Sequence, residues 1–242
     1  GDVRIGGHNI DGNSGILAYN FFPEVGDMVI DTADGFYNDT SQNSRDFRNV
    51  VAHEAGHGFG LNHVESNSAQ FLMEPFINSN FDGAQFDDIL AAHRGYGDAN
   101  EALSGVDNAT TAVDLGSIGD GETVSVGTDA DDAVVSATDT SFVSIDDNGD
   151  VDFYSFTVVA GASVSVTLTP QGPTYNRGPQ GGSQATFDAS AQSDLTLDIV
   201  DTNGTTVLTT SNSGAAGANE AIASFDLTNA GTYYVRVSGS DN

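Results

Sequence analysis

The sequence predicts two structural classes in one chain: an α+β segment over about the first 100 residues and an all-β sandwich after it. The first segment contains two stretches in which apolar residues recur at helical spacing, together with three short strand-like runs. After about residue 109 the helical spacing stops, and short alternating runs recur between Gly, Asn, Asp and Ser residues. Several short strands at such intervals are typical of a β-sandwich.

The first segment is expected to mix strands with a helix that carries the most polar motif of the chain. Its strand-like runs lie at 2–7, 16–22 and 27–32. A helix is expected over 44–58, where apolar residues follow a helical period. Ser44 is the expected N-cap, and Gly58 and Gly60 are expected to end the helix. A second helix is expected over 87–97, capped by Asp87 or Asp88 and stopped by the glycines at 95 and 97.

The second segment is expected to form the sandwich from seven short strands and one long loop. The strands are expected at 122–128, 152–159, 163–170, 195–201, 205–211, 221–227 and 232–239. Residues 169–187 are rich in Gly, Pro and polar residues, and this composition predicts a long loop.

The composition limits the partners and the environment of the protein. The chain has 35 acidic and 6 basic residues, for a net charge of -29. Such a surface repels nucleic acid and anionic membranes, so we expect neither as a partner. There is no cysteine, which excludes disulfides and thiolate metal sites. No apolar run is long enough to span a bilayer, and the composition suits a secreted or cell-surface bacterial protein.

The stretch "HEAGHGFGLNH" at 53–63 carries the candidate metal ligands. His53 and His57 are four residues apart, so a helix presents both imidazoles on one face. Glu54 can reach a water molecule on the same ion without binding the ion. Gly60 permits a sharp turn with positive φ, and this turn brings His63 back as a third ligand.

Three histidines leave one coordination position for water, which is the arrangement of a catalytic zinc site. Zinc lowers the pKa of that water, and Glu54 is placed to take the proton and pass it to the leaving amine. The alternative is a glycine-broken helix with incidental histidines. Against it, three of the five histidines of the chain fall at the required offsets. The complete spacing HExxHxxGxxH is the metzincin signature.

Residues 2–97 therefore resemble a matrixin-type metzincin, the group of zinc metallopeptidases that includes matrix metalloproteinases and their bacterial relatives. The resemblance implies a zincin-like catalytic fold and one catalytic zinc, with His53, His57 and His63 as its ligands. It also implies that Glu54 is the general base for peptide hydrolysis.

Further parts of the matrixin pattern lie outside the histidine motif. In "FLMEPF" the resemblance makes Met73 the Met-turn residue beneath the zinc and Pro75 the start of the S1′ pocket wall. The alternative for Met73 is ordinary core packing. "GILAYNFFP" is similar to the edge strand of the family, where Leu17 and Ala18 would pair by backbone with an extended substrate.

The resemblance also implies a structural calcium site formed by "DGNSGI" at 11–16 and "DTAD" at 31–34. Oxygen ligands of this kind suit calcium, while the alternative is two solvated acidic turns. The ligands would be the carboxylates of Asp11, Asp31 and Asp34 and the backbone carbonyls of Gly12, Ser14 and Ile16.

One family feature departs from the pattern. Animal matrixins carry a second, structural zinc held by three histidines. Here Tyr19 and Val29 occupy two of those positions, and only His8 lies near the right place. We therefore expect no structural zinc.

The second half resembles the bacterial pre-peptidase C-terminal domain through 150–168, 193–208 and 230–239. The expected boundaries are a matrixin-like domain over 1–100, a linker over 101–108 and the sandwich over 109–242. The acidic turn at 146–152 has a spacing that could hold calcium, although such turns are usually solvated.

Comparison with both families also suggests that the catalytic domain is N-terminally incomplete. A matrixin domain has two strands and a helix before the strand that 2–7 resembles, and the sandwich has a strand after residue 242. We therefore expect an upstream segment of the same precursor as a partner.

The sequence thus predicts a secreted zinc endopeptidase with a protein or peptide substrate and an appended β-sandwich. The first alternative is a structural or adhesive extracellular protein that keeps the fold without cutting. The second is a carbohydrate- or collagen-binding module in which the sandwich carries the function. The complete ligand set with Glu54 favours the enzyme.

Overall fold

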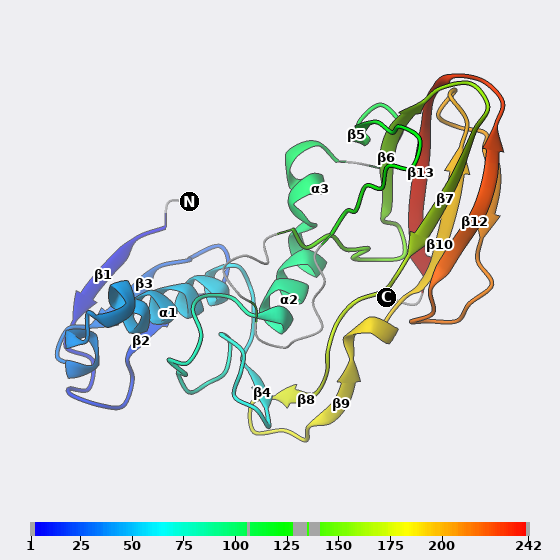
Figure 1. Cartoon of the computed structure of the whole chain (residues 1–242). Helices are drawn as coiled ribbons and strands as arrows, with labels where there is room; N and C mark the ends of the chain where they lie inside the picture. Colours follow the sequence, from blue (N-terminus) through cyan, green and yellow to red (C-terminus); the bar gives the residue numbers. More distant parts are fainter. Residues whose placement is uncertain (1–2, 106, 128–134, 136–140, 241–242) are drawn as a thin grey trace. The chain divides into compact units, whose positions relative to one another are not determined.

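The computed structural model describes residues 3–105, 107–127, 135 and 141–240 (Figure 1). The chain divides into two compact units that interleave along the sequence. The first unit takes Gly1–Ala92, Ala130–Thr138 and Pro173–Phe187, and the second takes the remaining segments. Each compact unit takes several separate segments of the chain. The domain boundaries expected from the family resemblance therefore stay a prediction.

A three-stranded sheet opens the first unit. Its strands are β1 (Ile5–His8), β2 (Ala18–Asn20) and β3 (Met28–Asp31), in the order β1-β3-β2. β1 runs parallel to β3, and β2 runs antiparallel to it. All three expected strands are confirmed. Ala18, Met28 and Ile30 pack with Val50 of the following helix in a small apolar core.

The motif helix α1 (Ser41–Gly58) follows a short 3-10 turn η1 (Gly35–Asn38). The expected N-cap at Ser44 is wrong. Gln42, Asn43 and Ser44 have φ between 53° and 57°, so they form a left-handed turn, and regular helical dihedral angles begin after it. The expected end is confirmed: the helix stops at Gly58, and Gly60 has a φ of +94°.

The second helix α2 (Phe86–Tyr96) is confirmed, but it begins before the expected caps, so the buried acids Asp87 and Asp88 lie within its first turn. The Asp88 carboxylate accepts a hydrogen bond from the backbone N–H of Gln85 at 2.8 Å, which satisfies one of the free donors at the start of the helix. Gly97, directly after the helix, has a φ of +73°, as expected for a terminating glycine.

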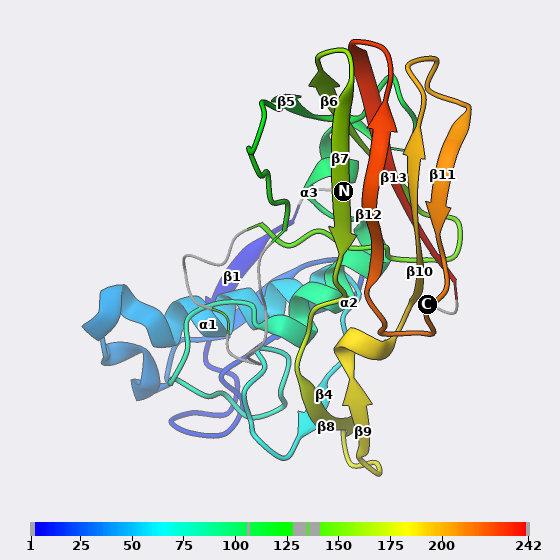
Figure 2. The same cartoon turned by 45° about the vertical axis from the view of Figure 1, so that its right-hand side comes forward.

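The second unit is the expected β-sandwich. One sheet has the order β11-β10-β13-β6-β5, and the β12-β7 pair faces it as a second layer (Figure 2). Leu197 and Ile199 are fully buried between the layers, next to Phe156 and Leu227. Its elements are α3 (Ala99–Ser104), β5 (Val113–Ser117), β6 (Val151–Val158), β7 (Ala162–Leu168), η2 (Ala189–Ala191), β10 (Asp194–Val200), β11 (Val207–Ser211), β12 (Glu220–Leu227) and β13 (Gly231–Ser240).

Six of the seven expected sandwich strands are confirmed. The exception is 122–128, where residues 122–127 form no strand and residue 128 lies outside the described part of the chain. Strand β5 forms instead at 113–117, where the sequence interpretation had placed no strand.

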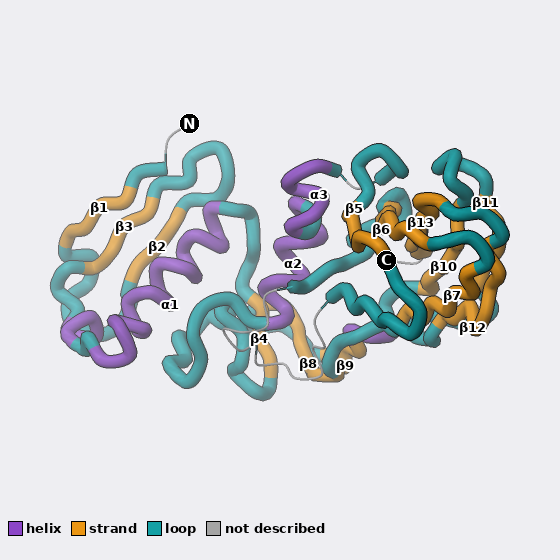
Figure 3. The backbone as a smooth tube through the Cα atoms, turned by 45° about the horizontal axis from the view of Figure 1, so that its top comes forward, coloured by secondary structure: helices purple, strands orange, loops and turns teal. Residues whose placement is uncertain are grey.

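The expectation of a long loop at 169–187 is wrong in part. This stretch contains β8 (Thr174–Pro179) and most of β9 (Ala185–Asp188), which form a three-stranded sheet with β4 (Val64–Ser66) in the order β4-β8-β9 (Figure 3). Pairing runs from Val64 opposite Pro179 to Ser66 opposite Arg177. A segment from the sandwich half of the sequence is thus a structural part of the first unit.

Candidate metal centre

The three motif histidines converge on one point. Nε2 of His63 lies 3.1 Å from Nε2 of His53 and 3.1 Å from Nε2 of His57. The helix α1 supplies the first two rings, and the turn at Gly60 returns the chain so that the third ring meets them. The expected convergence of these three side chains is therefore confirmed.

The opposite nitrogen of each ring donates a hydrogen bond to an oxygen. Nδ1 of His53 bonds to the Leu72 carbonyl at 2.6 Å, and Nδ1 of His57 bonds to the Leu61 carbonyl at 2.8 Å. Nδ1 of His63 bonds to the side-chain Oε1 of Gln180 at 2.8 Å. A ring that donates from Nδ1 keeps the Nε2 lone pair free when it is neutral, which is the tautomer that binds metals.

Burial favours this neutral form. It lowers the pKa of His53 to about 4 and also lowers the pKa of His57, so both rings are uncharged at neutral pH. Three cationic imidazoles at this distance would repel one another strongly. Neutral rings instead present three converging lone pairs.

This donor set fits zinc. Two ligands at zinc–nitrogen distances of about 2.0–2.1 Å in a tetrahedron lie about 3.3 Å apart, close to the observed spacing. Three nitrogen ligands leave the fourth position of the tetrahedron for water or substrate. His53, His57 and His63 are thus the residues that would hold the ion.

Glu54 lies beside this cluster and is only 6% exposed. Its Oε2 atom is buried without a hydrogen-bond partner. Burial raises the pKa of Glu54 to about 7, against a smaller opposing effect of a backbone hydrogen bond at Asn20. A buried carboxylate oxygen with an unused lone pair can accept a proton from a bound water, although a cation beside it would lower its pKa again.

The segment around Met73, which is the expected Met-turn, packs directly against α1. A Cβ built on Gly56 would lie 2.4 Å from Sδ of Met73, so the absence of a side chain at Gly56 allows this close approach. Asp88 of α2 also holds this turn, because its carboxylate accepts hydrogen bonds from the backbone N–H groups of Leu72 and Met73 at 2.8 and 2.9 Å. Met73 is 2% exposed, which places it in the core next to the motif helix.

The residues expected to meet substrate lie on an edge strand and after the Met-turn. β2 is at the edge of its sheet, with Ala18 buried and Leu17 half-buried beside it. Pro75 is half-buried, whereas the neighbouring Phe76 ring is 81% exposed. An edge strand can accept the backbone of an extended peptide.

The two segments expected to bind calcium do meet. The Asp31 carboxylate accepts the backbone N–H groups of Asp11 and Gly12, and Asp34 accepts the N–H of Ser14. The carboxylate of Asp11 accepts the N–H of Ile16. The three carboxylates do not come as close together as the ligand atoms of the histidine cluster, which lie within 4.8 Å of one another.

Asp31 is the fully buried centre of this loop contact. Burial opposes its ionisation, but hydrogen bonds from the backbone N–H groups of Ala33, Asp11, Ile10 and Gly12 outweigh that effect and lower its pKa to about 2. The loop is therefore held together by an ionised carboxylate that is already hydrogen-bonded.

The two positions that depart from the matrixin pattern, Tyr19 and Val29, are directly paired across β2 and β3. His8 lies at the end of β1, opposite Asp31 of β3. Its Nδ1 atom lies 2.7 Å from the carbonyl oxygen of Asn9.

The second unit contains another group of acids that come close to one another. Carboxylate oxygens of Glu101, Asp146 and Asp150 lie within 4.8 Å of one another, next to the helix start at Asp98. Burial raises the pKa of Glu101 and of the adjacent Asp152 to about 7. These acids include part of the turn at 146–152 that the sequence singled out.

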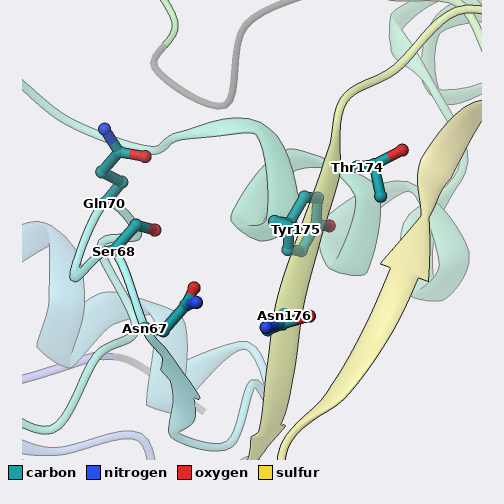
Figure 4. A pocket seen from close by; sticks show the side chains of 6 residues that line it. All are labelled: Asn67, Ser68, Gln70, Thr174, Tyr175 and Asn176. Carbon is teal, nitrogen blue, oxygen red and sulfur yellow. The ribbon is translucent and has the colours of Figure 1, made fainter.

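A shallow hollow of about 290 Å³ lies in the first unit between the loop after β4 and strand β8 (Figure 4). Its lining carries amides and hydroxyls and has no carboxylate or imidazole, so it is not a second acid–base centre. The lining residues are Asn67, Ser68, Gln70, Thr174, Tyr175 and Asn176.

Comparison with known families agrees with the motifs. Residues 3–97 match the family model described as Matrixin, and residues 150–239 match the model described as Bacterial pre-peptidase C-terminal domain. The resemblance to a matrixin followed by a pre-peptidase C-terminal domain is thus confirmed. The first match supports a metallopeptidase in general. No curated protein and no solved structure matches the chain. Within the described residues, no helix is both long and apolar enough to cross a membrane.

Sequence reasoning missed Gln180 as a partner of His63, and it missed Tyr175 and Arg177 as partners of Asp87. Gln180 lies 117 positions after His63, in a stretch interpreted as a loop. Nothing in its local sequence marks it as a neighbour of the histidines. The one available signal was that 173–187 interrupts the sandwich pattern with aromatic residues and an arginine.

Proposed function

We propose that the protein is a secreted zinc endopeptidase that hydrolyses peptide bonds with a zinc-bound water and Glu54 as general base. The observation that carries the proposal is the convergence of three Nε2 atoms whose rings all donate from Nδ1. Without a metal, this arrangement places three nitrogen lone pairs against one another, which is electrostatically unfavourable. A bound cation removes that repulsion.

Different residues of the chain have different roles in the proposed hydrolysis. When zinc is bound, it polarises the substrate carbonyl and lowers the pKa of its water. Glu54 accepts the proton of that water at Oε2 and delivers it to the leaving amine. Met73 packs against Gly56 of α1, and Asp88 fixes the position of the Met-turn.

The substrate in this proposal is an extended peptide that pairs with the free edge of β2 near Leu17 and Ala18. Pro75 would begin the wall of the pocket for the side chain after the cleaved bond. The exposed Phe76 ring lies next to that position, which supports a preference for apolar side chains there.

Secretion and calcium binding belong to the same proposal. The pre-peptidase C-terminal match and the high acidic charge support a secreted protein. For calcium, the support is that the loop at 11–16 and the acids at 31 and 34 lie together. The carbonyls of Gly12, Ser14 and Ile16 with Asp11, Asp31 and Asp34 remain the proposed ligands.

One experiment tests the proposal against a non-catalytic adhesive protein. The whole chain is incubated with a quenched peptide library, with and without a zinc chelator, beside the Glu54→Gln variant. We expect cleavage that the chelator abolishes and that zinc restores, and no cleavage by Glu54→Gln at unchanged zinc content. Cleavage by the variant within tenfold of the parent would refute the role of Glu54, and a zinc-loaded parent that cuts nothing would favour the adhesive alternative.

A further inference from the structure

We propose that Gln180 is a positioning residue of the metal centre and that the β8–β9 hairpin exists in the first unit to present it. This inference rests on the proposed zinc site. The hairpin comprises residues 174–188, from a part of the sequence that lies between sandwich strands β7 and β10.

The contact itself differs from those of the other two histidines. Backbone carbonyls of Leu61 and Leu72 accept the hydrogen bonds from His57 and His53, and both lie within 20 residues of their partners. Only His63 depends on a side chain, the Oε1 atom of Gln180 at 2.8 Å. His63 is also the ligand outside α1, so no helical backbone fixes its ring.

The hairpin is attached to the first unit through backbone and side chains. β8 pairs antiparallel with β4, the strand that follows His63 directly. Val64 lies opposite Pro179, so this register brings residue 180 next to residue 63. The register of the β4–β8 pairing therefore places Gln180 opposite His63.

A buried acid anchors the same strand. Asp87 of α2 accepts a hydrogen bond from the Tyr175 hydroxyl at 2.6 Å and from Nη1 of Arg177 at 2.9 Å. The Arg177 guanidinium also lies over the Phe187 ring of β9, 3.8 Å from its centroid. Because Asp87 is 4% exposed, the acid end of these two hydrogen bonds is shielded from water, which strengthens the attachment of β8.

The tip of the hairpin needs glycine. A Cβ on Gly178 would lie 2.4 Å from the carbonyl oxygen of Ser183 across the hairpin, and Gly181 has a φ of +69°. Glycine at these two positions allows the tight turn between β8 and β9 that contains Gln180. The conformation of the tip is therefore specified by the sequence.

The chemical effect follows from the tautomer. An amide oxygen that accepts from Nδ1 keeps the proton on that nitrogen and orients the ring, so Nε2 stays available for the ion. Loss of such a partner typically weakens metal binding about 10–100-fold. Gln180 is exposed, so water replaces it in part, and we expect the lower end of that range.

The test measures zinc affinity of the whole chain by competition with a chromophoric chelator. We expect Gln180→Ala to weaken zinc binding about tenfold and Gln180→Glu to restore or exceed the parent affinity, because a carboxylate accepts the same hydrogen bond. The matched control is Gln184→Ala, an exposed glutamine on the same hairpin, which should bind zinc like the parent. The cobalt(II) form should show a changed ligand-field spectrum in Gln180→Ala alone.

The outcomes separate the two proposals. If Gln180→Ala binds zinc as tightly as the parent, Gln180 has no positioning role, and the zinc site still stands. If Gln184→Ala weakens zinc binding as much as Gln180→Ala, the effect belongs to the hairpin in general and the assignment to Gln180 is wrong. If the parent binds zinc no better than His63→Ala, the metal centre itself is refuted and the role of Gln180 with it.

Discussion

At the scale of single residues, the helix that carries two of the candidate metal ligands packs closely against its neighbours. Gly56 illustrates this, because it allows Sδ of Met73 to reach the backbone of α1 one residue before His57. A well-packed interior resists even small additions of volume. The glycine is therefore a packing requirement inside a helix where glycine otherwise costs stability.

We expect Gly56→Ala to destabilise the first unit by about 1–3 kcal/mol, because the new methyl group overlaps Met73. Chemical unfolding followed by circular dichroism measures this change. The matched control is Gly95→Ala in α2, where a Cβ meets nothing within 4 Å. That variant should be neutral or stabilising by about 0.5–1 kcal/mol, and equal destabilisation of both variants would argue against the packing explanation.

At the scale of elements, one buried acid adds to the strand pairing that holds the β8–β9 hairpin. Asp87 accepts hydrogen bonds from two side chains of β8, and the ion pair with Arg177 is shielded on the acid side. Asp87→Asn keeps the shape of the side chain but removes its charge. The charge-assisted bond to Arg177 is then lost, and such bonds are about twice as strong as neutral ones.

We therefore expect faster hydrogen exchange of the β8 and β4 backbone amides in Asp87→Asn, measured by mass spectrometry. The comparison variant is Asp82→Asn, which breaks the exposed ion pair with Arg48. Exposed pairs contribute about 0–1 kcal/mol, so this change should leave exchange in β8 as it is. Unchanged exchange in both variants would show that strand pairing alone holds the hairpin.

At the scale of the whole molecule, buried acids make stability depend on pH. In the second unit, burial raises the pKa of Glu101 and Asp152 to about 7 and also raises the pKa of Asp146 and Asp150. The folded state thus binds protons more tightly than the unfolded chain, whose carboxyl groups titrate near pH 4. Their stabilising contribution is complete below about pH 4 and is lost as the pH rises through 7.

We expect the melting temperature of the second unit to rise when the pH falls from 7.5 to 5 in a metal-free buffer, as measured by calorimetry. Asp31 of the first unit has the opposite effect on the pH dependence of stability. Its pKa is lowered on folding, so its stabilising contribution is lost only below about pH 4. The Asp152→Asn variant should flatten the pH dependence of the second unit. A melting temperature that falls over the same pH interval would contradict the assignment.

The melting temperature of the first unit also tests the proposed calcium site. If the loop at 11–16 binds calcium with Asp31 and Asp34, a calcium-selective chelator lowers the melting temperature of the first unit. Asp34→Asn should reduce that shift, and the second unit should serve as the internal reference. No shift on chelation would leave the loop held by its own hydrogen bonds, as its N–H contacts to Asp31 allow.

The sequence alone determined the features that depend on local periodicity. The histidines at 53 and 57 share a face because a helix repeats every 3.6 residues, and Gly60 permits the turn to His63. The alternating runs after residue 150 became sandwich strands for the same local reason. The error at Ser44 is also local, since a left-handed turn replaced the expected cap.

Only the tertiary structure decided which distant groups complete the centre. Leu72 accepts from His53, Asp88 holds the Met-turn, and Gln180 reaches His63 from 117 residues away. These contacts depend on strand pairing and on the ion pair between Asp87 and Arg177, which join segments whose local sequences do not predict the contact. The physical reason is that a hydrogen bond depends on distance in space, and packing of the whole unit sets that distance.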